Sequence, residues 1–209
     1  MKTFFRIVAC LTIVAVTIVT APADDKNEIL KTGQNKTAKA IFAGGCFWCM
    51  EPPFEKLDGV YSVVSGYIGG QTEKPTYDEV SSGGTGHAEA IEITYDTNKV
   101  TYAQLLEVFW MNVDPTDEGG QFVDRGNQYR TGIFYLNEKQ KHQAQVSKDK
   151  LQDSGRYNKP IVTEIVAATT FYPAENYHQD YYEKNPVRYK FYRYQSGRDS
   201  YIKRIWGEN

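Results

Sequence analysis

The sequence predicts an α+β fold, a compact sandwich of strands and helices within one domain. The chain has 209 residues, of which 41% are hydrophobic and 24% charged, as in a soluble globular domain of ordinary size. Segments with strand patterns alternate with segments with helix patterns, without the fingerprint of a parallel sheet. Two long loops rich in glycine and polar residues interrupt this alternation, and such loops frequently carry active sites.

We expect residues 1–23 to be a secretory signal peptide. Lys2 and Arg6 give a basic start, residues 7–20 are apolar, and the segment ends in Ala-Pro-Ala, a cleavage pattern. The alternative is an uncleaved anchor, although this run is short for a hydrocarbon core about 30 Å thick. Polar residues 24–38 predict a flexible tether, and residues 39–209 would form the functional domain. The protein is then periplasmic or otherwise exported, without stable membrane insertion after cleavage.

The domain is predicted to begin with a strand and a short helix. Residues 39–43 form an apolar run that ends at two glycines. Residues 54–57 read as a short helix that stops at an Asp-Gly pair. Pro52 and Pro53 suit only a first helical turn, because proline donates no N–H. We therefore expect the regular helix to begin late and to leave the preceding cysteine pair in an irregular entry.

The middle of the domain predicts two strands around the first long loop, then a helix and the second loop. Residues 60–67 and 86–96 have strand patterns, and the loop between them holds a helical turn at residues 75–80. Apolar residues recur at helical spacing from Thr101, the expected N-cap, to Met111. The second loop, a strand, a polar helix and a further strand follow at residues 112–130, 131–136, 138–151 and 161–168.

The C-terminal tract, residues 188–204, carries six Lys or Arg side chains against one acid, interleaved with aromatic residues. Such tracts bind single-stranded nucleic acid in some proteins. The formal net charge of the whole chain is −2, which gives no general attraction to nucleic acid. We therefore expect no nucleic-acid partner, and an irregular aromatic tail packed on the core.

Cys46 and Cys49 are the only cysteines outside the leader. A zinc site would need a second pair of Cys or His ligands, whereas the three histidines are scattered, so we expect no metal. The plainest alternative is that Cys46 and Cys49 are simply two small residues of the core. The pair lies where a strand meets a helix, and free N–H groups at a helix start favour a thiolate and lower its pKa. A disulfide across so few residues would stabilise little, so a redox role explains the pair better.

Four motifs occur in a specific order along the chain. They are Gly45-Cys46-Phe47-Trp48-Cys49, Gly86-His87-Ala88-Glu89, Asp124-Arg125-Gly126-Asn127-Gln128-Tyr129-Arg130 and Tyr177-His178-Gln179. Together they resemble the peptide methionine sulfoxide reductase A family over roughly residues 39–206. The resemblance implies a ferredoxin-like α/β sandwich with long active-site loops. It also implies thiol-dependent repair of the S epimer of methionine sulfoxide, free or in proteins, without a cofactor.

Sulfoxide reduction needs a soft nucleophile, a proton source and an apolar slot for the substrate methyl group. Cys46 suits the first role. Glu89 suits the second, because a carboxyl group shielded by aromatic rings keeps its proton near neutral pH. Phe47 and Trp48 suit the third.

The resemblance adds the residues around the sulfoxide oxygen and the partners of the reaction. It implies that Tyr77 and Tyr129 donate hydrogen bonds to this oxygen and that Asp124 orders the site. A sulfenic acid then forms on Cys46, a second thiol converts it to a disulfide, and a thioredoxin-like dithiol reduces that disulfide. The partners would be proteins and peptides that contain methionine sulfoxide, and this external reductant.

The sequence departs from relatives that carry resolving cysteines near the C-terminus or at position 81, which is Ser here. Cys49 is therefore the only internal candidate for the second thiol, in a Cys46–Cys49 disulfide. A general exported thiol–disulfide oxidoreductase is a rival interpretation, but its βαβ context with a downstream cis-proline loop is not visible. A non-catalytic binding module is the other rival, and its two thiols would have ordinary reactivity.

Overall fold

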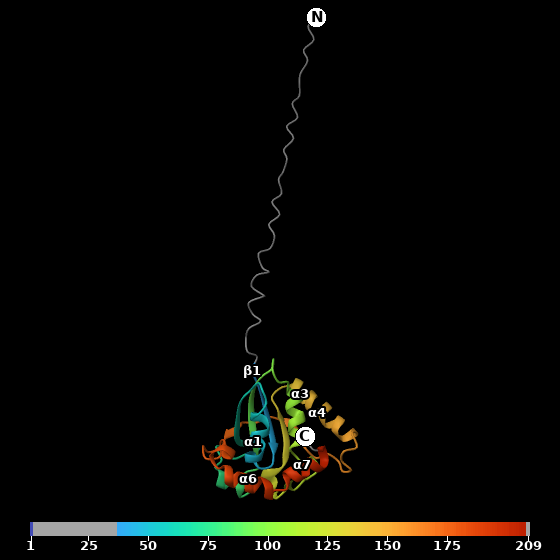
Figure 1. Cartoon of the computed structure of the whole chain (residues 1–209). Coiled ribbons are helices and arrows are strands. Elements are labelled where there is room, and N and C mark those ends of the chain that lie inside the picture. Colours follow the sequence, from blue (N-terminus) through green and yellow to red (C-terminus); the bar gives the residue numbers. More distant parts are fainter. Residues whose placement is uncertain (2–36, 208–209) are drawn as a thin grey trace. The chain divides into compact units, whose positions relative to one another are not determined.

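The computed structural model describes Met1 and residues 37–207 (Figure 1). Every element described below lies within one compact unit, Asn35–Asn209. The expected signal peptide and most of the expected tether lie outside the described residues. Among the helices that the structure describes, none is long and apolar enough to cross a membrane.

Six strands of the described chain form one sheet in the order β7-β6-β1-β3-β2-β8. β1 pairs antiparallel with β3 and β6, and β2 pairs antiparallel with β3 and β8. β6 and β7 are parallel. The strands span Thr37–Gly44 (β1), Val60–Ile68 (β2), Ala88–Asp96 (β3), Thr131–Tyr135 (β6), Glu164–Ala167 (β7) and Tyr172–Pro173 (β8).

The centre of the sheet has a ferredoxin-like arrangement. Helix α1 (Phe47–Glu55) connects β1 to β2, and helix α3 (Tyr102–Met111) lies between β3 and β6 in the chain. This gives the β-α-β-β-α-β order with the four strands arranged β6-β1-β3-β2. Thr101 caps α3, as predicted, and accepts a hydrogen bond from the backbone N–H of Gln104. The predicted α+β fold is confirmed.

The other elements lie in the two long loops or after β6. The loops contain α2 (Tyr77–Ser81), the two-stranded sheet β4 (Gly120–Gln121) and β5 (Asp124–Arg125), and the 3-10 helix η2 (Asn127–Tyr129). The later part of the chain contains α4 (Glu138–Asp153), α5 (Tyr181–Lys184), α6 (Pro186–Gln195) and α7 (Arg198–Trp206).

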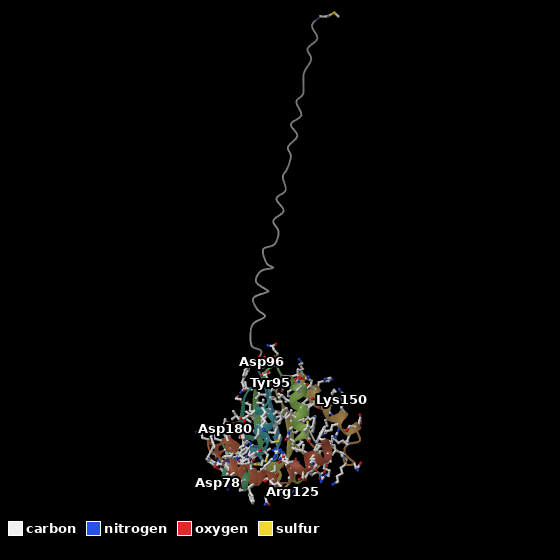
Figure 2. All side chains as sticks on the ribbon, in the orientation of Figure 1. Asp78, Tyr95, Asp96, Arg125, Lys150 and Asp180 are labelled. Carbon is white, nitrogen blue, oxygen red and sulfur yellow. The ribbon has the colours of Figure 1, made fainter. Side chains whose placement is uncertain are left out.

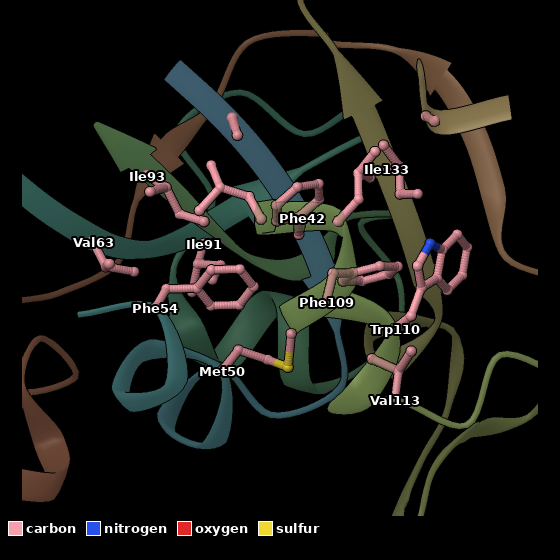
Figure 3. Packing of buried hydrophobic residues seen from close by; sticks show 14 of the residues in the cluster. Phe42, Met50, Phe54, Val63, Ile91, Ile93, Phe109, Trp110, Val113 and Ile133 are labelled. Carbon is pink, nitrogen blue, oxygen red and sulfur yellow. The ribbon is translucent and has the colours of Figure 1, made fainter. Parts of the chain in front are cut away.

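The main core lies between the sheet and helices α1 and α3 (Figure 3). Phe42 of β1 packs on Phe109 of α3 with 5.1 Å between ring centroids. Burial of one such side chain contributes about 1.5–3 kcal/mol relative to leaving it exposed. Charged side chains such as Asp78, Arg125 and Lys150 are exposed at the periphery (Figure 2). The sheet and α1 are thereby fixed as a rigid support for the cysteine pair.

Helix α1 begins at Phe47, so the prediction of a late start was wrong. Pro52 and Pro53 lie inside the helix. Pro53 lacks the N–H that would donate to the carbonyl of Cys49, four residues earlier. The guanidinium of Arg193 donates to that carbonyl at 2.9 Å and replaces the missing bond. A distant side chain therefore stabilises a helix that the local sequence disfavours.

The C-terminal segment is helical, so the prediction of an irregular tail was wrong. Pro186 occupies the first turn of α6, where its missing N–H costs nothing. Gly197, with φ +76°, takes the left-handed conformation that separates α6 from α7. Tyr201 of α7 is buried against the core, as expected for a segment held by its aromatic residues.

Candidate active site

Cys46 lies at the junction between β1 and α1, where it is the N-cap residue of the helix. Gly45 precedes it with φ +79°, and a Cβ there would approach the side chain of Gln121 to 2.6 Å, so only glycine fits this turn. The N–H of Cys49 donates to the Cys46 carbonyl at 3.0 Å. Both side chains are free thiols, with 6% of Cys46 and 1% of Cys49 exposed. The tight turn brings two buried sulfurs together.

The two thiols have opposite pKa shifts. Burial raises the pKa of Cys46 well above its usual value, and its hydrogen bond to Cys49 and the nearby Glu89 raise the pKa further. The hydrogen bond from Cys46 lowers the pKa of Cys49 against the effect of burial, and Arg198 and Arg193 lower it further. The surroundings of the pair therefore favour ionisation of Cys49 over ionisation of Cys46.

The expectation that the helix start lowers the pKa of Cys46 was wrong. The first N–H group of α1, on Phe47, is directed to Oε2 of Glu89 at 3.1 Å. This donor therefore stabilises the carboxyl group, and burial dominates at the thiol.

Glu89 is a buried carboxyl group on β3, with 2% of its surface exposed. Burial raises its pKa to about 8, although the hydrogen bond from Phe47 lowers it. The group therefore keeps its proton at neutral pH, as the sequence predicted, and has a proton to donate.

The two loops converge on this pair. Tyr77 begins α2 in the first loop, and its N–H donates to Oε1 of Glu175 at 2.8 Å. Burial raises the pKa of Tyr77 to about 12, and burial also raises that of Tyr129, at the end of η2 in the second loop. Glu89 and Cys46 contribute to both shifts, which places both hydroxyl groups near the reacting groups. Both tyrosines therefore remain hydrogen-bond donors.

Asp124 of β5 is half-buried, and its Oδ2 accepts a hydrogen bond from the Tyr192 hydroxyl at 2.5 Å. Burial raises the pKa of this carboxyl group, against the effects of Tyr192 and Arg198. Asp124 in turn contributes to the pKa shifts of Cys46 and Glu89. It therefore connects the second loop, the C-terminal helices and the reacting groups.

Aromatic rings form one wall beside the thiols. Trp48 stacks on Tyr181 with 3.7 Å between ring centroids and an interplanar angle of 5°. Its indole N–H donates to Nδ1 of His178 at 3.0 Å. His178 also contacts the rings of Phe47 and Tyr77, at 5.0 Å and 4.4 Å between centroids. Phe47, Trp48, Tyr77, His178 and Tyr181 therefore form one packed aromatic cluster beside the cysteine turn.

Every residue predicted for the site is therefore part of one cluster, but the residues that surround it were missed. His178 was noted only as part of a motif, and no role was predicted for Tyr192, Arg193 or Arg198. The one sequence signal for Tyr192, Arg193 and Arg198 was the basic and aromatic composition of the C-terminal tract, residues 188–204.

The chain is similar to known proteins in both sequence and structure. The chain is 55% identical over 172 residues to the peptide methionine sulfoxide reductase MsrA of Bacillus licheniformis, covering 82% of this chain and 95% of that protein. It is 62% identical over 151 residues to MsrA of Streptococcus agalactiae, covering 72% and 89%. Among solved structures, reduced Mxr1 from Saccharomyces cerevisiae matches with TM-score 0.68 and 31% identity, covering 72% of this chain and 86% of that one. Methionine sulfoxide reductase A of Corynebacterium diphtheriae matches with TM-score 0.64 and 33% identity, covering 74% and 77%.

A ferredoxin-like α+β domain with a buried dithiol beside a protonated carboxyl group defines a thiol-dependent oxidoreductase. The family profile described as peptide methionine sulfoxide reductase matches residues 38–209. The chain belongs to the peptide methionine sulfoxide reductase family.

Proposed function

We propose that the chain repairs proteins by reducing the S epimer of methionine sulfoxide, free or in peptides and proteins, to methionine. The single observation that carries this proposal is the pairing of Cys46 with Glu89 at the start of α1. The residue after the thiol, Phe47, holds the carboxyl group through its N–H at 3.1 Å. A nucleophile and a proton donor are thus fixed side by side, and no cofactor is needed for the chemistry.

In the first step the Cys46 sulfur attacks the sulfoxide sulfur while Glu89 protonates its oxygen. The oxygen passes from the methionine sulfur to the Cys46 sulfur, which becomes a sulfenic acid, and methionine is released. The methionine sulfur gains two electrons and the cysteine sulfur loses two. The thiol proton of Cys46 passes to Glu89 and replaces the proton that Glu89 gave to the oxygen, so the step consumes no net proton and leaves Glu89 protonated.

The surrounding residues bind the sulfoxide. Tyr77 and Tyr129 keep their hydroxyl protons and donate to the sulfoxide oxygen, where negative charge grows during the attack. Phe47 and Trp48 contact the methyl group, and Asp124 orders the loop through its bond to Tyr192.

In the second step the Cys49 thiolate attacks the Cys46 sulfenic acid. The new S–S bond forms as the S–O bond breaks, and the departing hydroxide takes a proton from Glu89 and leaves as water. We propose that a thioredoxin-like protein then reduces the Cys46–Cys49 disulfide, since this step requires a two-electron dithiol donor. Mxr1 has been solved in complex with Trx2.

The N-terminal segment supports an exported location, periplasmic or otherwise secretory. Its basic start, apolar run and Ala-Pro-Ala sequence are those of a cleaved leader. N-terminal sequencing of the protein recovered outside the cytoplasm should begin at Asp24, and recovery of an intact leader would refute cleavage.

A turnover assay on the two separated epimers of a methionine sulfoxide peptide tests the reaction. We expect the S epimer to be consumed and the R epimer to remain. Consumption of neither epimer, with an ordinary thiol–disulfide exchange activity, would instead identify a general oxidoreductase.

A further inference from the structure

Arg198 is a fully buried guanidinium group, with 0% of its surface exposed. Its Nη2 donates to the Gly44 carbonyl at 2.9 Å, and its Nη1 contacts Asn112 O and, at 3.3 Å, the sulfur of Met50. Its side chain forms no ion pair with any carboxylate group in residues 37–207. A buried charge without an opposite charge is strongly unfavourable, so a compensating anion is expected nearby.

Arg193 places a second cation on the same turn. Its Nη1 donates to the Cys49 carbonyl at 2.9 Å, and its Nε pairs with the exposed Asp199 at 2.7 Å. Together the two arginines hold carbonyl groups at both ends of the turn, at Gly44 and at Cys49. Both side chains come from the C-terminal helices, Arg193 from α6 and Arg198 from α7.

The charges around Cys49 identify the anion. The titratable and charged groups that act on it or lie beside it come from the turn itself and from β3, β5, α6 and α7, and they are Cys46, Glu89, Asp124, Tyr189, Tyr192, Arg193 and Arg198. Glu89 keeps its proton, because burial raises its pKa to about 8. Asp124 opposes a thiolate at Cys49, and the two tyrosines keep their protons because burial raises their pKa values. The two arginines are the cations of this group, and both lower the pKa of Cys49.

We propose that Arg193 and Arg198 are positioning residues for disulfide formation, which hold Cys49 as a thiolate against Cys46 before the sulfenic acid forms. This inference rests on the proposed resolving role of Cys49. The thiolate attacks Cys46 sulfur, the S–S bond replaces the S–O bond, and hydroxide leaves as water after taking the proton of Glu89. The charge that the arginines stabilise is therefore consumed in this step.

The test compares Arg193→Met, Arg198→Met and Arg198→Lys with Arg188→Met, a control at an exposed position of α6. One equivalent of sulfoxide is added to each reduced enzyme without reductant, from pH 5.5 to pH 9. Methionine release and disulfide formation are followed separately by acid quench, alkylation and mass spectrometry.

We expect the two methionine variants to form the disulfide more slowly than wild type at low pH. The loss is about three- to tenfold for each unit by which the pKa of Cys49 rises, because the thiolate becomes scarcer but more nucleophilic. At a pH above the pKa of Cys49 in both wild type and variant, the methionine variants should form the disulfide as fast as wild type or faster. The pH profiles of the two proteins should therefore cross. The rate of disulfide formation in Arg198→Lys should lie between those of wild type and Arg198→Met, and the rate in Arg188→Met should match wild type.

Equal rates at every pH, or a loss that does not depend on pH, would overturn the inference. If circular dichroism shows that Arg198→Met does not fold, the result for Arg193→Met decides the test, because Arg193 lies at the edge of the core. Titration of thiolate absorbance near 240 nm in the reduced proteins, without substrate, should show the first ionisation at higher pH in the methionine variants. Because this titration needs no substrate, its result does not depend on the proposed reaction. Absence of methionine release from wild type would refute the proposed function, whereas a titration that does not shift in the variants would refute the role of the arginines.

Discussion

The N–H of Phe47 donates to Oε2 of Glu89 at 3.1 Å, which joins the residue after the first thiol to a buried carboxyl group on β3. Burial alone would raise the pKa of Glu89, and this bond is the main opposing effect. The balance leaves a pKa of about 8, so the group is protonated at neutral pH and still able to lose its proton.

Replacement of Glu89 by Gln should lower turnover by about 100-fold or more near pH 6.5, because an amide cannot deliver a proton. Wild-type activity should decline as pH rises through about 8, where Glu89 ionises, so the two proteins should converge at alkaline pH. Steady-state rates from pH 6 to pH 9.5 check this expectation. A variant as active as wild type at pH 6.5 would exclude Glu89 as the proton donor.

Cys46→Ser should abolish sulfoxide reduction, with a loss of at least about a thousandfold, because the variant lacks the sulfur that is paired with the proton donor Glu89. The fold should persist, since the hydroxyl group fills the same N-cap position. Turnover with dithiothreitol is the measurement, and circular dichroism is the control. Activity above a few per cent of wild type would show that another residue is the nucleophile.

Cys49→Ser should release one equivalent of methionine and then accumulate a sulfenic acid on Cys46, which dimedone traps. Turnover with a thioredoxin-like protein should be poor, whereas small thiols should restore part of it by reaching the sulfenic acid directly. Mass spectrometry of the wild type after one turnover should instead show a Cys46–Cys49 disulfide. A wild-type protein that keeps a stable sulfenic acid with Cys49 free would contradict the resolving role.

Glu51 offers a test of stability that is separate from catalysis. Its carboxyl group is fully buried, accepts a hydrogen bond from the Ser65 hydroxyl at 2.7 Å, and has a pKa that burial raises to about 8. A carboxyl pKa that is higher in the folded than in the unfolded protein gives stability that is present at low pH and is lost as pH rises through about 8.

Glu51→Gln should therefore lose less stability than wild type between pH 5 and pH 9. A difference of 1 kcal/mol corresponds to about 2–4 °C in Tm for a domain of this size. Thermal unfolding at both pH values, with the exposed Glu107→Gln as a control, measures the effect. Identical pH dependence in wild type and Glu51→Gln would show that this carboxyl group ionises freely.

Local patterns predicted the parts of the structure that local interactions stabilise. Helix α3 was predictable because Thr101 and Gln104 cap each other within one turn. Cys46 was placed at a strand-to-helix junction from its local pattern, as the structure has it, whereas Glu89 was singled out because its motif resembles that of the family.

Long-range contacts decided what the sequence did not predict. Helix α1 contains two prolines and depends on Arg193, which lies 144 residues from its partner Cys49. Burial raises the pKa of Cys46, and Glu89, which lies 42 positions after Phe47 and takes the first N–H of the helix, raises it further. Such partners lie too far apart in the chain for a local sequence pattern to predict their contact.

The arginine bonds to Cys49 and Gly44 also have a consequence for biosynthesis. Arg193 and Arg198 lie 144 and 154 residues beyond the carbonyl groups that they hold. A ribosome therefore releases β1, α1 and both thiols long before it makes the residues that bracket them. The growing polypeptide carries an uncovered dithiol until α6 and α7 have been made, and only then can the cysteine turn reach its finished form.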